Sequence, residues 1–143
     1  MTTEKVLLVD DEVEFVEALA ERLRSRGLEV ETAHDGHTGV SRVEARTYDA
    51  VVLDFAMPGM NGIDTLKAML ALRADLQVML LTGQATVKAA VEATRLGAVD
   101  VLEKPTDIGT LLEKIRLARG KRIAAAEKRS QKEVEEILRT RGW

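Results

Sequence analysis

Short apolar runs alternate with longer helical segments along most of the chain. The apolar runs cover about residues 5–9, 28–33, 50–53, 77–81 and 99–102, and helix-like periodicity covers about residues 12–26, 36–46, 63–73 and 86–95 and a stretch from about 108. Strands that alternate with helices in this way indicate βαβ units and a parallel sheet. The pattern therefore predicts an α/β fold with helices on both faces of the sheet.

The apolar runs also differ in how they are expected to be buried. The first, third and fourth are almost wholly apolar, which is typical of strands that are covered on both faces. The run at 28–33 instead alternates apolar residues with Glu29, Glu31 and Thr32. This alternation favours an edge strand with one wetter face.

Polar and charged residues follow four of these runs. Asp10 and Asp11 come after the first run, Asp54 after the third, Thr82 after the fourth and Lys104 after the fifth. The carboxyl ends of parallel strands share one edge of the sheet, where open α/β folds bind ligands. Two carboxylates about 4 Å apart repel by roughly 4 kcal/mol at an effective dielectric near 20, so a cation or separation must relieve them. The alternative is that these are unrelated turn or helix-cap aspartates.

Composition excludes several classes of protein. The chain has 143 residues, enough for one domain with a core, and no cysteine, which excludes a disulfide framework, a thiolate metal site and a cysteine nucleophile. The N-terminus has no signal-peptide pattern, and no apolar run approaches the length of a membrane span. We therefore expect a cytoplasmic protein without a membrane segment.

Four motifs stand in order along the chain. They are Val-Asp-Asp-Glu at 9–12, Leu-Asp-Phe-Ala-Met-Pro-Gly-Met-Asn-Gly at 53–62, Leu-Thr-Gly at 81–83 and Glu-Lys-Pro at 103–105. With these motifs, roughly residues 4–119 resemble the receiver domain of response regulators in two-component signalling. The resemblance implies a doubly wound, flavodoxin-like fold whose five-stranded parallel sheet has the order 2-1-3-4-5.

The resemblance also implies roles for three of the residues. Asp54 would be the phosphoacceptor, which takes a phosphoryl group from a phosphohistidine on a sensor histidine kinase or a histidine phosphotransfer protein. Thr82 and Lys104 would bind phosphoryl oxygens after transfer, and the Lys104–Pro105 bond would be cis. Such a domain catalyses only its own phosphorylation and dephosphorylation, so we do not expect an enzyme in the usual sense.

A magnesium site is implied at the same edge. Asp10, Asp11, Asp54 and the backbone carbonyl of Ala56 would hold Mg²⁺, Asp10 either directly or through water. The chemistry of the residues agrees, because Mg²⁺ prefers oxygen ligands and is typically bound through one or two carboxylates together with a phosphate.

Two departures from the family pattern leave a second interpretation open. Val101 and Val99 occupy positions that are often aromatic in the family, and a β-branched valine has few rotamers. Ala56 and Gln84 occupy positions that tune the phosphoryl lifetime. The alternative is a receiver-like scaffold or dimerisation module that is not phosphorylated.

The chain divides near Gly120 in our prediction, into a receiver domain at 1–119 and a charged helical extension or linker at 120–143. Residues 113–143 carry a net charge of +5, against −8 for residues 1–112. The extension could continue the last helix, form a separate helix or fray. Its basic charge leaves open that the extension binds nucleic acid or another acidic partner, although nucleic-acid binding by the receiver itself is not expected. A homodimer and an output domain or partner protein are also left open.

Two histidines lie near the end of the second predicted strand. His34 and His37 invite a metal or phosphotransfer role, but no further ligand accompanies them. We predict that both are surface residues.

Overall fold

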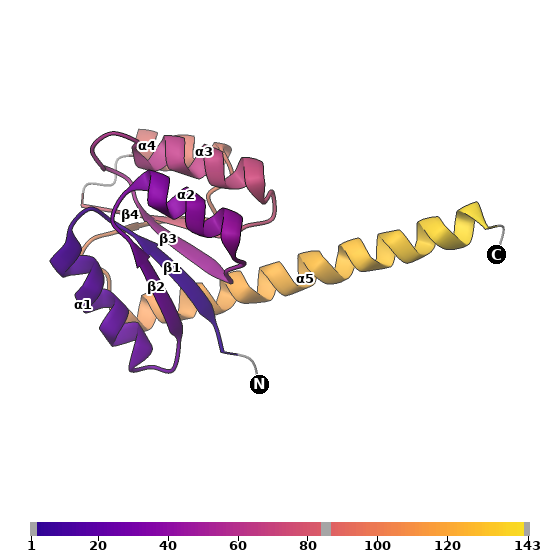
Figure 1. The fold of residues 1–143 in the computed structure, drawn as a ribbon, viewed down its shortest axis with the longest axis horizontal. Helices are drawn as coiled ribbons and strands as arrows, with labels where there is room; N and C mark the ends of the chain where they lie inside the picture. Colours follow the sequence, from indigo (N-terminus) through magenta and orange to yellow (C-terminus); the bar gives the residue numbers. More distant parts are fainter. Residues whose placement is uncertain (1–2, 84–86, 142–143) are drawn as a thin grey trace.

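The computed structural model describes residues 3–83 and 87–141, which form a five-stranded parallel sheet with helices on both faces (Figure 1). The strand order is β2-β1-β3-β4-β5, which confirms the predicted fold class and topology. The elements in chain order are β1 (Lys5–Val9), α1 (Val13–Arg24), β2 (Glu29–Ala33), α2 (Gly36–Ala45), β3 (Ala50–Asp54), α3 (Gly62–Leu72), β4 (Val78–Thr82), α4 (Val87–Arg95), β5 (Asp100–Glu103) and α5 (Ile108–Thr140).

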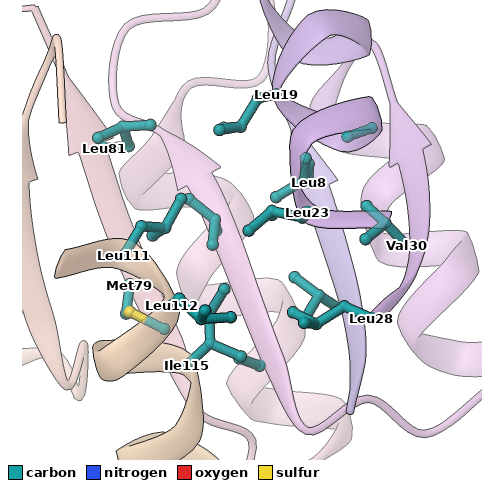
Figure 2. Close-up of a cluster of buried hydrophobic side chains, with 14 of the residues drawn as sticks. Leu8, Leu19, Leu23, Leu28, Val30, Met79, Leu81, Leu111, Leu112 and Ile115 are labelled. Atoms are coloured by element: carbon teal, nitrogen blue, oxygen red, sulfur yellow. The ribbon is translucent and has the colours of Figure 1, made fainter. Parts of the chain in front are cut away.

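Two apolar clusters cover the two faces of the sheet. One joins the sheet to α1 and α5, and its side chains include Leu8, Leu23 and Leu111 (Figure 2). The other joins the sheet to α2, α3 and α4, and includes Val43 and Met69. Aliphatic side chains dominate both clusters, so dispersion and burial of aliphatic surface hold the layers together.

The strand ends differ slightly from the prediction. Asp54 and Thr82 are the last residues of β3 and β4, whereas the sequence pattern placed them just after those strands. Both side chains are buried, at 5% and 4% exposure. The edge position of β2 is confirmed, and its side chains are partly exposed as the alternation predicted.

Helix α5 continues without a break through Gly120 (Figure 1). Of the three alternatives for the extension, the structure has the one in which it prolongs the last helix. Arg122 Nε donates a hydrogen bond of 2.9 Å to the buried Asp49 carboxylate, its Nη2 lies 2.7 Å from the same oxygen, and Arg129 pairs with Asp75 at 2.7 Å. These contacts attach the first turns of the extension to the body. Within residues 3–83 and 87–141, no helix is both long and apolar enough to cross a membrane.

Candidate functional site

Asp10 is held rigidly at the carboxyl end of β1. Its main-chain N–H donates to the Ala33 carbonyl over 3.0 Å, and its Oδ1 accepts the main-chain N–H of Glu12 over 2.8 Å. The Asp10 side chain is only 5% exposed. The bond from Glu12 replaces a side-chain cap at the start of α1, because Glu12 itself makes no capping bond. The turn between β1 and α1 therefore fixes the direction of the Asp10 carboxylate.

Asp54 ends β3 beside Asp10, because β1 and β3 are neighbours with Val9 opposite Leu53. The loop that follows folds tightly back onto the strand end, where the Gly62 N–H donates to the Phe55 carbonyl over 2.9 Å. A Cβ at Gly62 would lie 2.6 Å from the carbonyl oxygen of Asp54, so only glycine fits here. Asn61 then caps α3 by accepting the N–H of Asp64. This close approach sets the position of the Asp54 carboxylate.

Lys104 reaches across the sheet edge to both carboxylates. Its main-chain N–H donates to the Thr82 carbonyl over 2.7 Å, which anchors the residue directly after β5. Its ammonium lies 2.8 Å from Asp10 Oδ2 and 3.5 Å from Asp54 Oδ1, and the side chain is 12% exposed. The Lys104–Pro105 bond is cis, as the resemblance implied. Three strand ends thus bring one cation and two buried carboxylates together.

The site raises the pKa values of Asp54 and Lys104. Burial and the negative charge of Asp10 raise the pKa of Asp54 to about 7, against the opposing charge of Lys104. Asp11 raises it further through a side-chain hydrogen bond and its charge. Burial opposes the charge on Lys104, but the hydrogen bond to Asp10 and the nearby carboxylates outweigh it and raise the pKa of Lys104. The single ammonium leaves the group of acids under-neutralised.

The donor set at this edge fits a hard cation. Among the described residues, Asp10, Glu12 and Asp54 each offer a carboxylate oxygen, and these atoms all lie within 4.8 Å of one another. Asp11 is half-buried, and Ala56 is exposed in the loop after β3. Mg²⁺ prefers oxygen ligands, and these acids carry more negative charge than the Lys104 ammonium neutralises.

The structure adds two residues to which the sequence analysis gave no role here. Glu12 places Oε1 3.4 Å from the Lys104 ammonium. The Phe15 ring lies below the same ammonium, with the ring centroid 4.5 Å from Nζ, and also packs against the core cluster beneath α1 and α5. One indication of a role at the site was present in the sequence, because both residues lie in the first turn after Asp10 and Asp11.

The remaining predicted residues lie as follows. Thr82 is buried at the end of β4, next to the position that pairs with Asp54. Val101 packs against the cluster under α2, α3 and α4. His34 and His37 are exposed, as predicted, and His34 contacts Glu17. Gln84 lies outside the described residues.

A family model decides what kind of domain this is. The model for the response regulator receiver domain matches residues 6–116. The chain belongs to the response regulator receiver family. Receiver domains are signalling domains of two-component systems, and the four motifs lie together at the edge of the sheet where the acids gather.

Curated relatives of this receiver domain are named as regulators. It is 37% identical over 113 residues to the transcriptional regulatory protein ZraR of Salmonella typhimurium, covering 79% of this chain and 26% of ZraR. It is 32% identical over 122 residues to the acid tolerance regulatory protein ActR of Rhizobium meliloti, covering 85% of this chain and 63% of ActR. The chain therefore spans about a quarter of the first relative and less than two thirds of the second.

Solved structures agree with the fold. A CheY-like response regulator receiver domain protein from Methanospirillum hungatei JF-1 superposes with a TM-score of 0.82 at 26% identity, over 87% of this chain and 99% of that one. The receiver domain protein of Clostridium thermocellum gives a TM-score of 0.81 at 27% identity, over 85% of this chain and 98% of that one.

Proposed function

We propose that this receiver domain takes a phosphoryl group onto Asp54 and thereby switches its contacts with other proteins or with itself. The observation that carries the proposal is the position of the Lys104 ammonium, 2.8 Å from Asp10 and 3.5 Å from Asp54 at the sheet edge. Burial and the charge of Asp10 raise the pKa of Asp54 to about 7, so added positive charge at the site stabilises its ionised form.

The donor in the proposal is a phosphohistidine on a sensor histidine kinase or a histidine phosphotransfer protein. An oxygen of Asp54 forms a bond to phosphorus while the P–N bond breaks. The electron pair of that bond stays on the imidazole nitrogen, so the histidine is released without the phosphoryl group. Positioning and charge neutralisation are the main requirements of such a transfer. Lys104 and the Thr82 hydroxyl would bind phosphoryl oxygens of the product.

Magnesium is the proposed cofactor. Asp10, Asp11, Asp54 and the Ala56 carbonyl would hold it, and the 4.8 Å grouping of carboxylates adds Glu12 as a further oxygen donor nearby. Bound Mg²⁺ supplies positive charge that lowers the repulsion between the acids and an incoming phosphoryl group. The Glu12 N–H bond to Oδ1 orients the Asp10 carboxylate that would bind the ion.

Intact mass after incubation with acetyl phosphate tests the proposal. We expect a Mg²⁺-dependent gain of one phosphoryl group, absent from Asp54→Ala. The matched control is Asp64→Ala, which removes an exposed carboxylate in the first turn of α3. Equal gain by the chain and by Asp54→Ala, or no gain with the fold intact, contradicts the proposal.

A second candidate is a contact module that works without phosphorylation. Helix α5 exposes apolar side chains beyond the body, among them Val134 at 54% and Ile137 at 51%. This surface favours association with a second copy or a partner protein. Association measured by sedimentation that is the same for the untreated chain and for Asp54→Ala, with no phosphorylation of either, would favour this candidate.

A further inference from the structure

The Lys104 ammonium sits between carboxylates and one aromatic face. Asp10 lies 2.8 Å away, Glu12 3.4 Å and Asp54 3.5 Å. On another side, the Phe15 ring centroid is 4.5 Å from the same nitrogen. An ammonium within about 6 Å of an aromatic centroid is attracted by the electron density of the ring face.

The Phe15 ring is itself held in place. It projects from the first turns of α1, is half-buried, and packs against the core cluster beneath α1 and α5. The same ring lines a small, partly open hollow together with Asp10, Asp54 and Leu81. One side of the side chain is therefore fixed by aliphatic packing, and the ring face is presented to the acid site.

Glu12 is the weaker of the two additional contacts on Lys104. Its side chain is 64% exposed, and an ion pair with an exposed partner is screened by water. The ring, in contrast, meets an ammonium that is only 12% exposed, where a cation–π contact is stronger. Apart from Asp10 and Asp54, Phe15 is therefore the main contact that holds the Lys104 ammonium in place.

We infer that Phe15 is a positioning residue for phosphoryl transfer, because its ring face holds the Lys104 ammonium at the two buried carboxylates. The effect on phosphoryl transfer rests on the proposed function of Asp54, whereas the contact between Phe15 and Lys104 does not. An aliphatic side chain at position 15 fills much of the same space but offers no negative face. Lys104 then samples more rotamers, and fewer encounters with a phosphodonor find it in place.

Four variants separate the effect of the aromatic ring face from the effect of side-chain volume. Phe15→Tyr keeps the aromatic face, Phe15→Met and Phe15→Leu keep apolar bulk without it, and Glu12→Gln removes the exposed carboxylate. The first readout is the ¹H shift of the Lys104 ε-methylene in the metal-free chain, assigned by its loss in Lys104→Arg. We expect a ring-current upfield shift in the wild type and Phe15→Tyr, and its loss in Phe15→Met. The same shift in the wild type and Phe15→Met overturns the inference.

The second readout is the rate of Mg²⁺-dependent phosphorylation by acetyl phosphate. We expect Phe15→Met and Phe15→Leu to be slower by about three- to fivefold, the size of a modest cation–π contact. Phe15→Tyr should stay near the wild-type rate, and Glu12→Gln should fall by less than Phe15→Met. Equal loss in Phe15→Tyr and Phe15→Met assigns Phe15 a packing role and overturns the inference, as does an unchanged rate in Phe15→Met. If the wild type shows the ring-current shift but gains no phosphoryl group, the proposed function fails while the Lys104–Phe15 contact stands.

Discussion

The Nζ atom of Lys104 donates a hydrogen bond of 2.8 Å to Asp10 Oδ2, joining residues that are 94 positions apart in the chain. The bond spans four neighbouring strands, because Asp10 follows β1, Lys104 follows β5, and β3 and β4 lie between them. It neutralises one buried acid and leaves Asp54 at a longer distance. This inequality between the two carboxylates underlies the first prediction.

Asp54→Asn should stabilise the metal-free protein, and more so at higher pH. The pKa of Asp54 is raised from 3.8 to about 7, so the folded state binds the proton more tightly than the unfolded state. The stabilisation from that proton is complete below about pH 4 and is lost as pH rises toward 7. Asn at position 54 stays uncharged as the pH rises. The free energy of unfolding of the variant should therefore exceed that of the wild type by about 1–3 kcal/mol at about pH 8 and by much less at about pH 5.

Urea unfolding in EDTA at these two pH values checks this. The matched control is Glu44→Gln, which removes an exposed carboxylate from α2. A gain for Asp54→Asn that is no larger at the higher pH would contradict the account, and Mg²⁺ should reduce the gain.

The phenol of Tyr48 should resist ionisation. Burial, followed by the charge of Glu31 and the hydrogen bond to it, raises the pKa of Tyr48 to about 12 from its usual 10.0. Tyr48 is the single tyrosine, so phenolate absorbance reports it alone. At about pH 11 we expect a mostly neutral phenol in the folded chain and a mostly ionised one in denaturant. Equal ionisation under the two conditions would show that Tyr48 is not shielded.

Arg122→Gln should destabilise the protein more than Arg129→Gln. Asp49 is 4% exposed and would lose the hydrogen bond and ion pair with Arg122, keeping the Lys5 N–H bond and a longer Arg119 contact at 4.0 Å. Leaving a buried carboxylate poorly paired costs about 1–3 kcal/mol, whereas an exposed pair is worth at most about 1 kcal/mol. Arg129 and Asp75 are 61% and 33% exposed and serve as the control pair. Equal losses in urea unfolding would mean that Asp49 does not anchor α5.

Two glycines should respond oppositely to alanine. Gly120 lies inside α5, and a Cβ there meets nothing within 4 Å, so Gly120→Ala should stabilise the helix by about 0.5–1 kcal/mol. At Gly62 a Cβ would meet backbone atoms at 2.6–2.8 Å, so Gly62→Ala should cost about 2 kcal/mol or more. Circular dichroism during thermal unfolding measures the stability of both variants. A loss of helix in Gly120→Ala would contradict a continuous α5.

The sequence predicted the fold class and the sheet-edge residues well. The alternation of apolar runs predicted parallel strands, whose carboxyl ends share an edge, and the resemblance implied the strand order that brings Asp10, Asp54 and Lys104 together. The contact between Phe15 and Lys104 was not predictable in this way, since it depends on two rotamers across the sheet. The place of Phe15 in the first turn after Asp10 and Asp11 was the one indication in the sequence, and it does not show which way the ring faces.

The boundary near Gly120 shows a different limit. A glycine and a change in composition indicated a boundary and left open whether the last helix continues; one glycine costs a helix only about 1 kcal/mol, so it does not decide this. Arg122 and Arg129 contact Asp49 and Asp75 from beyond that point. These partners are distant in sequence, so the chain alone did not reveal that the helix is held there.

The most direct test is to locate the phosphoryl group. An acyl phosphate is reduced by borohydride, which converts the modified aspartate to homoserine and leaves free carboxylates unchanged. After acetyl phosphate and Mg²⁺ treatment, peptide mass spectrometry should find homoserine at position 54 and aspartate at positions 10 and 11. Homoserine at position 10 or 11, or at none of the three in a chain that gained phosphoryl mass, would contradict the assignment of Asp54 as the phosphoacceptor.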